Sequence, residues 1–362
     1  MVRRRLLSCA VALLVGTVLV PWPAGQVASA DTLPARLTDA ELWTLSETLS
    51  EPNGFFRTDN ILSNELYYPE VLPGLAAKVK AGGVYLGVGP EQNFHYIAAL
   101  RPKMVFITDV RRGNLHAQLM YKALFELSPD RASFVSRLFT KTRPPGLSPK
   151  SSAGELMQAF WDVPTGPQAA FDANVRDVVE HLTKTHAFPL SADDVEGIKY
   201  VYNHFYWYGP SITYSSAQGG GRAGSMATYA QLMTSTDEKG AEQSFLASEE
   251  AFAVLRELES RNMVVPVVGN FGGPRALRAV GKYVRDHGAT VDVFYLSNVE
   301  QYLRQDSIWG AFCANVASMP LTANSTFIRS QSMGGGGFRN FLGPMQSETA
   351  GCGAPGGPDP SR

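Results

Sequence analysis

Apolar residues in the first third of the chain alternate between strand-like and helix-like patterns. Short, nearly unbroken apolar runs predict buried strands at residues 83–87 and 104–109. A helix is predicted over 91–100, and apolar residues at helical spacing predict a second one over 113–127. Strand, helix, strand and helix in this order predict a parallel sheet with right-handed crossovers.

The same rhythm returns near the carboxyl end of the chain. Strands are predicted at 263–268 and 290–296, followed by helices at 274–287 and 298–303 respectively. A last strand is expected at 325–329. Together the two halves predict an α/β fold, in which a Rossmann-like, mostly parallel sheet is flanked by helices.

A long segment between the two halves lacks their rhythm. It contains predicted helices, a proline-rich loop and an aromatic stretch at 200–216, followed by glycines at 219–221. We interpret it as a helical, aromatic-rich insertion that packs as a lid over the sheet edge. The predicted organisation is a signal peptide at 1–30, an N-terminal helical segment at 31–80, the two halves of the Rossmann-like domain at 81–129 and 263–330, the insertion at 130–262, and a glycine-rich, disordered tail at 331–362.

The amino terminus has the pattern of a secretory signal. Arginines at 3–5 precede an apolar stretch at 6–20, and Ala28-Ser29-Ala30 then matches a cleavage site. We therefore expect an exported protein of bacterial type, periplasmic or secreted, cleaved near Ala30. No stable membrane insertion is expected after cleavage, because no later stretch is long and apolar enough to span a bilayer.

Composition narrows the classes of partner. Hydrophobic residues make up 44% and charged residues 18% of the chain, and the formal net charge is -1, as in an ordinary folded protein. No basic run interleaves with aromatic residues, so we expect no nucleic-acid surface. A small-molecule ligand is the expected partner.

The metal-binding residue types give no recognisable pattern. Cys313 and Cys352 remain after the predicted cleavage, and an exported compartment permits either a disulfide between them or free thiols. Two cysteines are too few for a structural zinc site built from cysteine ligands. The six histidines are scattered without an H-E-x-x-H motif, so no metal is expected.

The strongest chemical signal is the sequence GVGPEQN at 87–93, which follows a predicted strand and opens a helix. Glycines in this context let the backbone turn tightly and let a ligand approach the helix N-terminus. Asp109 ends the next strand, 20 residues after Gly89, which is the spacing of an acid that binds ribose hydroxyls. The pattern predicts a nucleoside-type ligand, and a purely structural tight turn remains the alternative.

Departures from the dinucleotide fingerprint favour a looser site than a pyrophosphate cradle. Gln92 replaces the third glycine, and Pro90 removes an amide donor from the turn. Arg111 and Arg112 follow the acid and offer partners for a phosphate or carboxylate. The absence of a Walker A motif disfavours phosphoryl transfer of that type.

A glycine loop after the first strand and an acid ending the second resemble class I S-adenosylmethionine-dependent methyltransferases. The segments GVGPEQNFHYIAALRP, DVRRGNL, LMYKALFELSPDRASFVSRLF, GNFGGPRALRAVGKY and YLSNVEQYL are similar to a family of uncharacterised bacterial proteins with that fold, over roughly residues 40–330. The resemblance implies S-adenosylmethionine as cofactor. It implies that Gly87, Gly89, Glu91 and Asp109 line the cofactor site, to which we add Asn93 and Arg111 as neighbours.

Candidate catalytic residues come from the aromatic stretch and from a later turn. His204 offers a general base, and Tyr208 or Tyr214 an orienting donor. The alternative is that these aromatic residues fill a core between the insertion and the sheet. The resemblance places Asn270 near the transferred methyl group.

Two functions therefore stand side by side. The first is a methyltransferase-like enzyme that acts on an unidentified small molecule, which the two glycines and Asp109 favour. The second is a non-catalytic ligand-binding protein that keeps the fold. Tyr85, which stands where many methyltransferases have an acid, Gln92 and the signal peptide favour this second function.

Overall fold

A computed structural model describes residues 31–218, 226–333 and 337–352. The predicted signal peptide at 1–30 and the glycines at 219–221 lie outside the described residues. Within the described residues, no helix combines the length and apolar character needed to cross a membrane.

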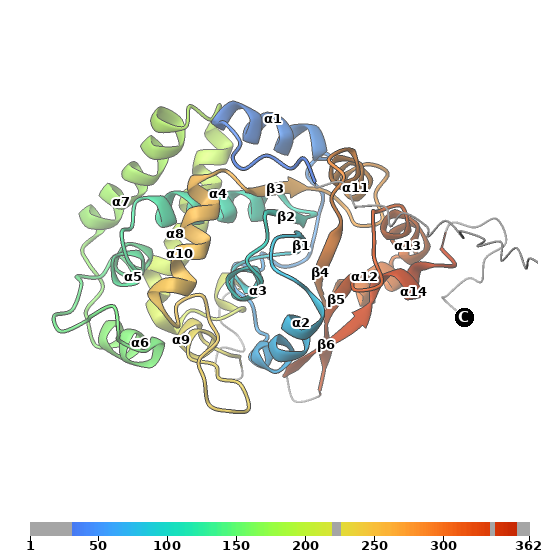
Figure 1. Ribbon diagram of the computed structural model, residues 1–362. Coiled ribbons are helices and arrows are strands. Elements are labelled where there is room, and N and C mark those ends of the chain that lie inside the picture. The colour runs from blue at the N-terminus through green and yellow to red at the C-terminus, as the bar shows by residue number, and fades with distance from the viewer. Residues whose placement is uncertain (1–30, 219–225, 334–336, 353–362) are drawn as a thin grey trace, which may run out of the picture. The chain divides into compact units, whose positions relative to one another are not determined.

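The centre of the fold is one six-stranded sheet in the order β3-β2-β1-β4-β5-β6 (Figure 1). Neighbouring strands are parallel from β3 through β5, and β6 pairs antiparallel with β5. This confirms the predicted α/β fold with a mostly parallel sheet. The strands are β1 (Val84–Gly87), β2 (Met104–Asp109), β3 (Val264–Val268), β4 (Val291–Ser297), β5 (Thr326–Ser332) and β6 (Phe338–Pro344).

The strand order reverses direction at β1. The chain runs outward from β1 to β2 and β3, then returns to place β4 on the other side of β1. In open α/β sheets, the connections that leave two such strands go to opposite faces and open a crevice at the carboxyl ends. The crevice is expected beyond β1 and β4.

Helices cover both faces of the sheet (Figure 1). Helices α3, α4 and α10 pack together on one face, while α11 and α13 pack together on the other, and α1 lies against β3 and α11. The helices are α1 (Asp39–Leu49), α2 (Leu72–Lys78), α3 (Gln92–Leu100), α4 (Arg112–Glu126), α5 (Arg131–Phe139), α6 (Ala153–Trp161), α7 (Gln168–Glu180), α8 (Ala192–Tyr208), α9 (Tyr229–Met233), α10 (Glu249–Ser260), α11 (Ala276–Asp286), α12 (Val299–Gln305), α13 (Trp309–Ala317) and α14 (Met345–Thr349), with short helical turns η1 (Tyr68–Val71), η2 (His181–Thr185), η3 (Gly209–Ser211) and η4 (Ser216–Gln218).

The predicted insertion forms an outer layer on α4, where a lid over the sheet edge was expected. Helix α8 packs along α4, and α5 and α7 pack against α8. Most of the aromatic stretch belongs to α8, and its buried Tyr202, Phe205 and Tyr206 face this layer. Phe205 stands edge-on to Tyr121 of α4, with 5.9 Å between ring centroids. These three side chains therefore fill a core between the helices, whereas Tyr200, Trp207 and Tyr208 of the same stretch are exposed.

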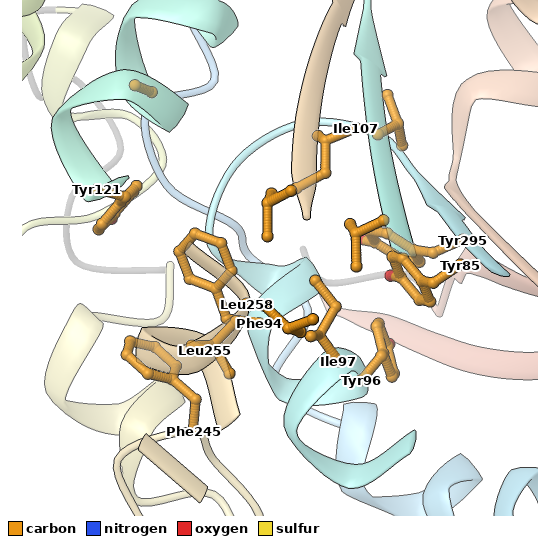
Figure 2. Close-up of a cluster of buried hydrophobic side chains, with 14 of the residues drawn as sticks. Tyr85, Phe94, Tyr96, Ile97, Ile107, Tyr121, Phe245, Leu255, Leu258 and Tyr295 are labelled. Carbon is orange, nitrogen blue, oxygen red and sulfur yellow. The ribbon is translucent and has the colours of Figure 1, made fainter. Parts of the chain in front are cut away.

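A second aromatic cluster joins the inner helices to the sheet. Phe94 of α3 contacts Tyr121 and Phe125 of α4 edge-on, at centroid distances of 5.0 and 5.4 Å. Phe245 packs on Phe94 from the segment that leads into α10. Figure 2 shows this cluster beneath the sheet, with Tyr85 and Tyr295 on its strand side. Such edge-to-face packing fixes α3 relative to α4 and to the segment that leads into α10.

The N-terminal segment 31–80 is less helical than predicted. Thr38 caps α1, since its side chain accepts the Glu41 N–H while the Glu41 carboxylate accepts the Thr38 N–H. Between α1 and η1, however, residues 50–67 contain no helix or strand. This segment crosses the carboxyl end of the sheet, where the Glu91 side chain accepts a hydrogen bond from its backbone at Ser63.

The tail, predicted to be disordered, contains one strand and one helix that the sequence analysis did not predict. Strand β6 and helix α14 follow the glycine-rich part of the sequence, and β6 completes the sheet by pairing along all of β5. A disulfide joins Cys313 of α13 to Cys352 just after α14. The bridge fastens the end of the tail to the helical layer.

Replacing both Cys313 and Cys352 with serine should lower the free energy of unfolding. The bridge closes a loop across 39 residues of sequence, and the chain-entropy model assigns such a loop about 3–4 kcal/mol. Urea unfolding of the variant and of the oxidised wild type measures the difference. Unchanged stability in the variant would show that the bridge does not hold the tail.

Candidate functional site

A cavity of about 690 Å³ lies at the carboxyl ends of the strands, where the strand order predicts a crevice. Its floor comes from the residues that follow four parallel strands, and its rim from the segment 55–65. The lining includes Val88, Gly89 and Pro90 after β1, Asp109 and Val110 at β2, Gly269, Asn270 and Phe271 after β3, Ser297, Asn298, Val299, Tyr302 and Leu303 at β4 and α12, and Phe55–Glu65 in part. A volume of this size is in the range of small-molecule sites.

The two predicted loop glycines serve different purposes. A Cβ at Gly87 would collide with the Asn93 side chain, whose amide donates to Val88 O at 2.9 Å and Pro90 O at 2.7 Å. Gly89 has φ +75°, and a Cβ there would meet open space. Gly87 and Asn93 therefore shape the loop from behind, while Gly89 faces the cavity.

Tyr85 also supports the loop. It lies on β1, fully buried, and its hydroxyl donates to Asn93 Oδ1 at 3.0 Å. From α4, Gln118 donates to Gly89 O at 3.1 Å. The Tyr85 side chain thus holds the glycine loop in place through Asn93.

Glu91 lies behind the loop and outside the lining. It is fully buried, and both carboxylate oxygens accept the Ser63 N–H, at 3.2 and 3.3 Å. Burial raises the pKa of its carboxyl to about 8, although the bond from Ser63 opposes the shift. Glu91 thereby fixes segment 55–65 over the glycine loop.

Asp109 ends β2 and reaches the cavity wall with 6% of its surface exposed. Its carboxylate accepts the Arg111 N–H at 2.9 Å. Burial raises the pKa of Asp109, and the Arg111 guanidinium, 3.7 Å away, opposes this shift. The Arg111 guanidinium also donates to Asp59 at 3.3 Å. Arg111 does not itself line the cavity, and it holds Asp109 and Asp59 in place from behind the wall.

Glu65 is a cavity residue that the sequence analysis missed. It is buried between the end of β4 and β6, where Ser297 donates to one carboxylate oxygen and Asn340 donates to the other at 2.5 Å. Burial raises its pKa, against these hydrogen bonds. Segment 55–65 has no regular pattern, and β6 was not predicted, so no signal in the sequence indicated this position.

Asn270 lines the cavity after β3, but its side-chain oxygen already accepts a hydrogen bond from the chain itself. Its Oδ1 accepts the Gly272 N–H at 2.9 Å. Glu51 lies alongside and accepts the N–H groups of Arg275 and Ala276, at 2.8 and 2.9 Å. A carboxylate of the chain itself therefore occupies the start of α11, where an anionic ligand group would otherwise bind.

The predicted catalytic residues separate into two groups. Tyr214 lines the cavity and its hydroxyl lies 3.1 Å from Thr58 Oγ1. His204 and Tyr208 lie on the exposed side of α8, outside the lining, and His204 contacts the backbone oxygen of Tyr200. The structure thus brings Gly89, Asp109, Asn270 and Tyr214 to one cavity, with Gly87, Glu91, Asn93 and Arg111 behind its wall.

Replacing Glu91 with glutamine should flatten the pH dependence of stability. The pKa of the Glu91 carboxyl is near 4.5 in the unfolded chain and about 8 in the folded protein. Glu91 therefore stays protonated up to a higher pH in the folded state. The contribution of Glu91 to the free energy of unfolding therefore falls as pH rises from about 4.5 to about 8.

Glutamine keeps an acceptor for Ser63 and does not ionise. Between pH 5 and pH 8, urea unfolding should show a loss smaller by at least about 1 kcal/mol in Glu91→Gln than in wild type. Glu259, whose pKa burial also raises to about 8, contributes alike to both proteins. Equal losses in the two proteins would contradict the role given to Glu91.

Comparison with known proteins places the chain in a family. It matches the model of a domain of unknown function, DUF7790, over residues 61–145 and 168–345. These segments include the glycine loop, Asp109 and Glu65. The comparison with curated proteins found no match. Because the matched segments make up more than half of the sequence, the chain belongs to the family of the domain of unknown function DUF7790.

Proposed function

We propose that the cavity binds a nucleoside-type ligand related to S-adenosylmethionine and that the protein is methyltransferase-like. The observation that carries the proposal is the placement of Gly89 and Asp109 on one cavity at the carboxyl ends of adjacent strands. An acid on the strand beside the glycine loop is in position to accept hydrogen bonds from ribose hydroxyls. Aromatic side chains at the rim, among them Phe55 and Tyr302, offer surfaces for a base.

The charges in the wall favour a ligand that carries positive charge. Carboxyl groups of Glu65, Asp109 and Asp306 line the cavity, and Arg57 is the guanidinium among the described lining residues. A bound cation would favour the charged carboxylates and so oppose the rise in pKa that burial causes at Glu65 and Asp109. Pro90 has no N–H to offer to a phosphate at the glycine loop. A sulfonium nucleoside therefore fits this wall better than a dinucleotide with its pyrophosphate.

Gly89 and Asp109 would hold the nucleoside, with Glu65 available near its charged end. The sulfonium group of such a ligand supplies an electrophilic methyl carbon. The chain contributes position and orientation, which can account for much of the rate of a transfer between bound groups. Tyr214 would orient a substrate as a hydrogen-bond donor, since burial raises its pKa and keeps it protonated.

A non-catalytic binding function has its own support. No histidine occurs among the described residues that line the cavity, so a general base of that type is missing. Glu65 is also already bonded to Ser297 and Asn340. In this second candidate function, the exported protein would capture a nucleoside-type ligand and release it unchanged.

Thermal unfolding with a ligand panel tests the binding proposal. S-adenosylmethionine and S-adenosylhomocysteine should each raise the melting temperature by a few degrees, because a ligand at one hundred times its dissociation constant stabilises by about 2.7 kcal/mol. NAD and ATP should give much smaller shifts because of the acidic wall. No shift with any of the four compounds, in a sample that melts cooperatively, would contradict the proposal.

Replacing Asp109 with alanine should weaken binding of the adenosyl compounds at least about tenfold, since ribose hydroxyls lose a charged acceptor. Titration calorimetry gives the affinity. Asp172→Ala is the matched control, because Asp172 is exposed on α7 and bonded only locally to Gln168. Unchanged affinity in Asp109→Ala would remove the ribose role from this residue.

A further inference from the structure

A compact cluster of metal-binding side chains lies away from the cavity, where α4 ends. Glu126 is the last residue of α4, and His181 and His186 flank the π-helical turn η2 after α7. Glu126 Oε2 lies 2.6 Å from His181 Nε2 and 2.5 Å from His186 Nε2. The two Nε2 atoms lie 3.3 Å apart, so three ligand-type atoms converge on one point.

The separation of the two nitrogens is that of neighbouring ligands on a tetrahedral ion. Zinc–nitrogen bonds of about 2.0–2.1 Å at the tetrahedral angle place two nitrogens about 3.3 Å apart. The carboxylate oxygen is closer than this to both nitrogens. It would withdraw by about 0.8 Å to admit the ion, a shift within reach of a side chain at a helix end.

The backbone produces this convergence through the π-helical turn. Residues five apart do not face the same way on an ordinary α-helix, but a π-helix bonds residue i to i+5. Here the His186 N–H donates to His181 O at 3.1 Å. The wider turn brings both imidazoles to the side that faces Glu126. Local π-helical turns are frequent at functional sites.

Neighbouring groups orient each ligand atom. His186 Nδ1 lies 2.7 Å from Asp39 Oδ1, and Asn262 donates to the same oxygen at 2.8 Å. A carboxylate on the far nitrogen is the usual partner of a metal-bound histidine. Lys122 donates to Glu126 Oε1 at 2.8 Å, which leaves Oε2 directed at the two histidines.

We propose that Glu126, His181 and His186 form a binding site for a divalent transition-metal ion of the zinc type, with the fourth position open to water. Two imidazoles and one carboxylate are an established ligand set for zinc. The three side chains are 8–16% exposed, which shields the site and leaves it an entry path. This departs from the expectation of no metal, because Glu126 is 55 residues from His181 in sequence and no short motif joins them.

The charges that face the site are compatible with a cation. Asp39 and Glu126 are acidic, and Lys122 is paired with Glu126. Burial raises the pKa of the nearby Glu259 to about 8, which favours its neutral form. Without a metal, two imidazole N–H groups must share one carboxylate oxygen. An ion would replace that crowded arrangement and join α4, the turn after α7 and, through Asp39, α1.

Calorimetric titration of the chelator-treated protein with Zn²⁺ tests the proposal. We expect one ion per chain and a higher melting temperature with Zn²⁺. His181→Gln and His186→Gln should lose this binding. Asp39→Asn should weaken it by about 10–100-fold, because Asp39 orients the His186 ring. His287→Gln is the matched control, since His287 lies just after α11 and its Nδ1 contacts the Tyr283 backbone oxygen of that helix.

A second readout separates metal binding from folding. Co²⁺ in place of Zn²⁺ should give the intense visible absorption of a tetrahedral nitrogen and oxygen site in the wild type and in His287→Gln. Circular dichroism of the metal-free variants reports whether they fold. Failure of the wild type to bind Zn²⁺, or equal Zn²⁺ affinity in a folded His181→Gln variant, would overturn the proposal.

Discussion

The pairing of β4 with β1 is the constraint on which the rest of the structure depends. Strand β4 lies on the free edge of β1, opposite β2 and β3. The helices that leave β1 and β4 therefore cover opposite faces, and the carboxyl ends of the two strands open between them. The glycine loop after β1 and Ser297 at the end of β4 both line the cavity that results.

The carboxyl groups of Glu91, which is buried, and Glu51, which is half-buried, then hold an irregular segment over this opening. Segment 50–67 has no helix or strand to satisfy its backbone. Glu91 accepts the N–H of Ser63, and Glu51 accepts amides at the start of α11. Burying an acid is costly unless it is hydrogen-bonded or protonated, and the raised pKa of Glu91 reflects that cost. The wall of the cavity is thus stabilised by groups that do not line the cavity.

Local patterns made much of the sheet predictable. Largely apolar runs marked the first four strands, a fifth was expected at 325–329, and the change to helical spacing marked α4. Thr38 was recognisable as a cap because Glu41 follows three residues later. The position of Asp109 on the cavity followed from its place at the end of a strand.

Contacts between distant segments were not predictable in the same way. Strand β6 has few apolar residues and follows a run of glycines, so its sequence does not show the pattern of a buried strand. Its place in the sheet depends on pairing with β5. Glu65 enters the cavity only because Ser297 and Asn340 meet it there. The cluster of Glu126, His181 and His186 depends on a π-helical turn, which no spacing rule for ordinary helices reveals.

Amide hydrogen exchange with and without S-adenosylhomocysteine tests most directly whether the opening between β1 and β4 is the ligand site. The account predicts slower exchange with ligand in segment 55–65, in the glycine loop around Gly89 and in the turn after Ser297. Exchange in α5, α6 and α7 should stay unchanged. Protection confined to those outer helices, or no protection in the three cavity segments with ligand bound, would contradict it.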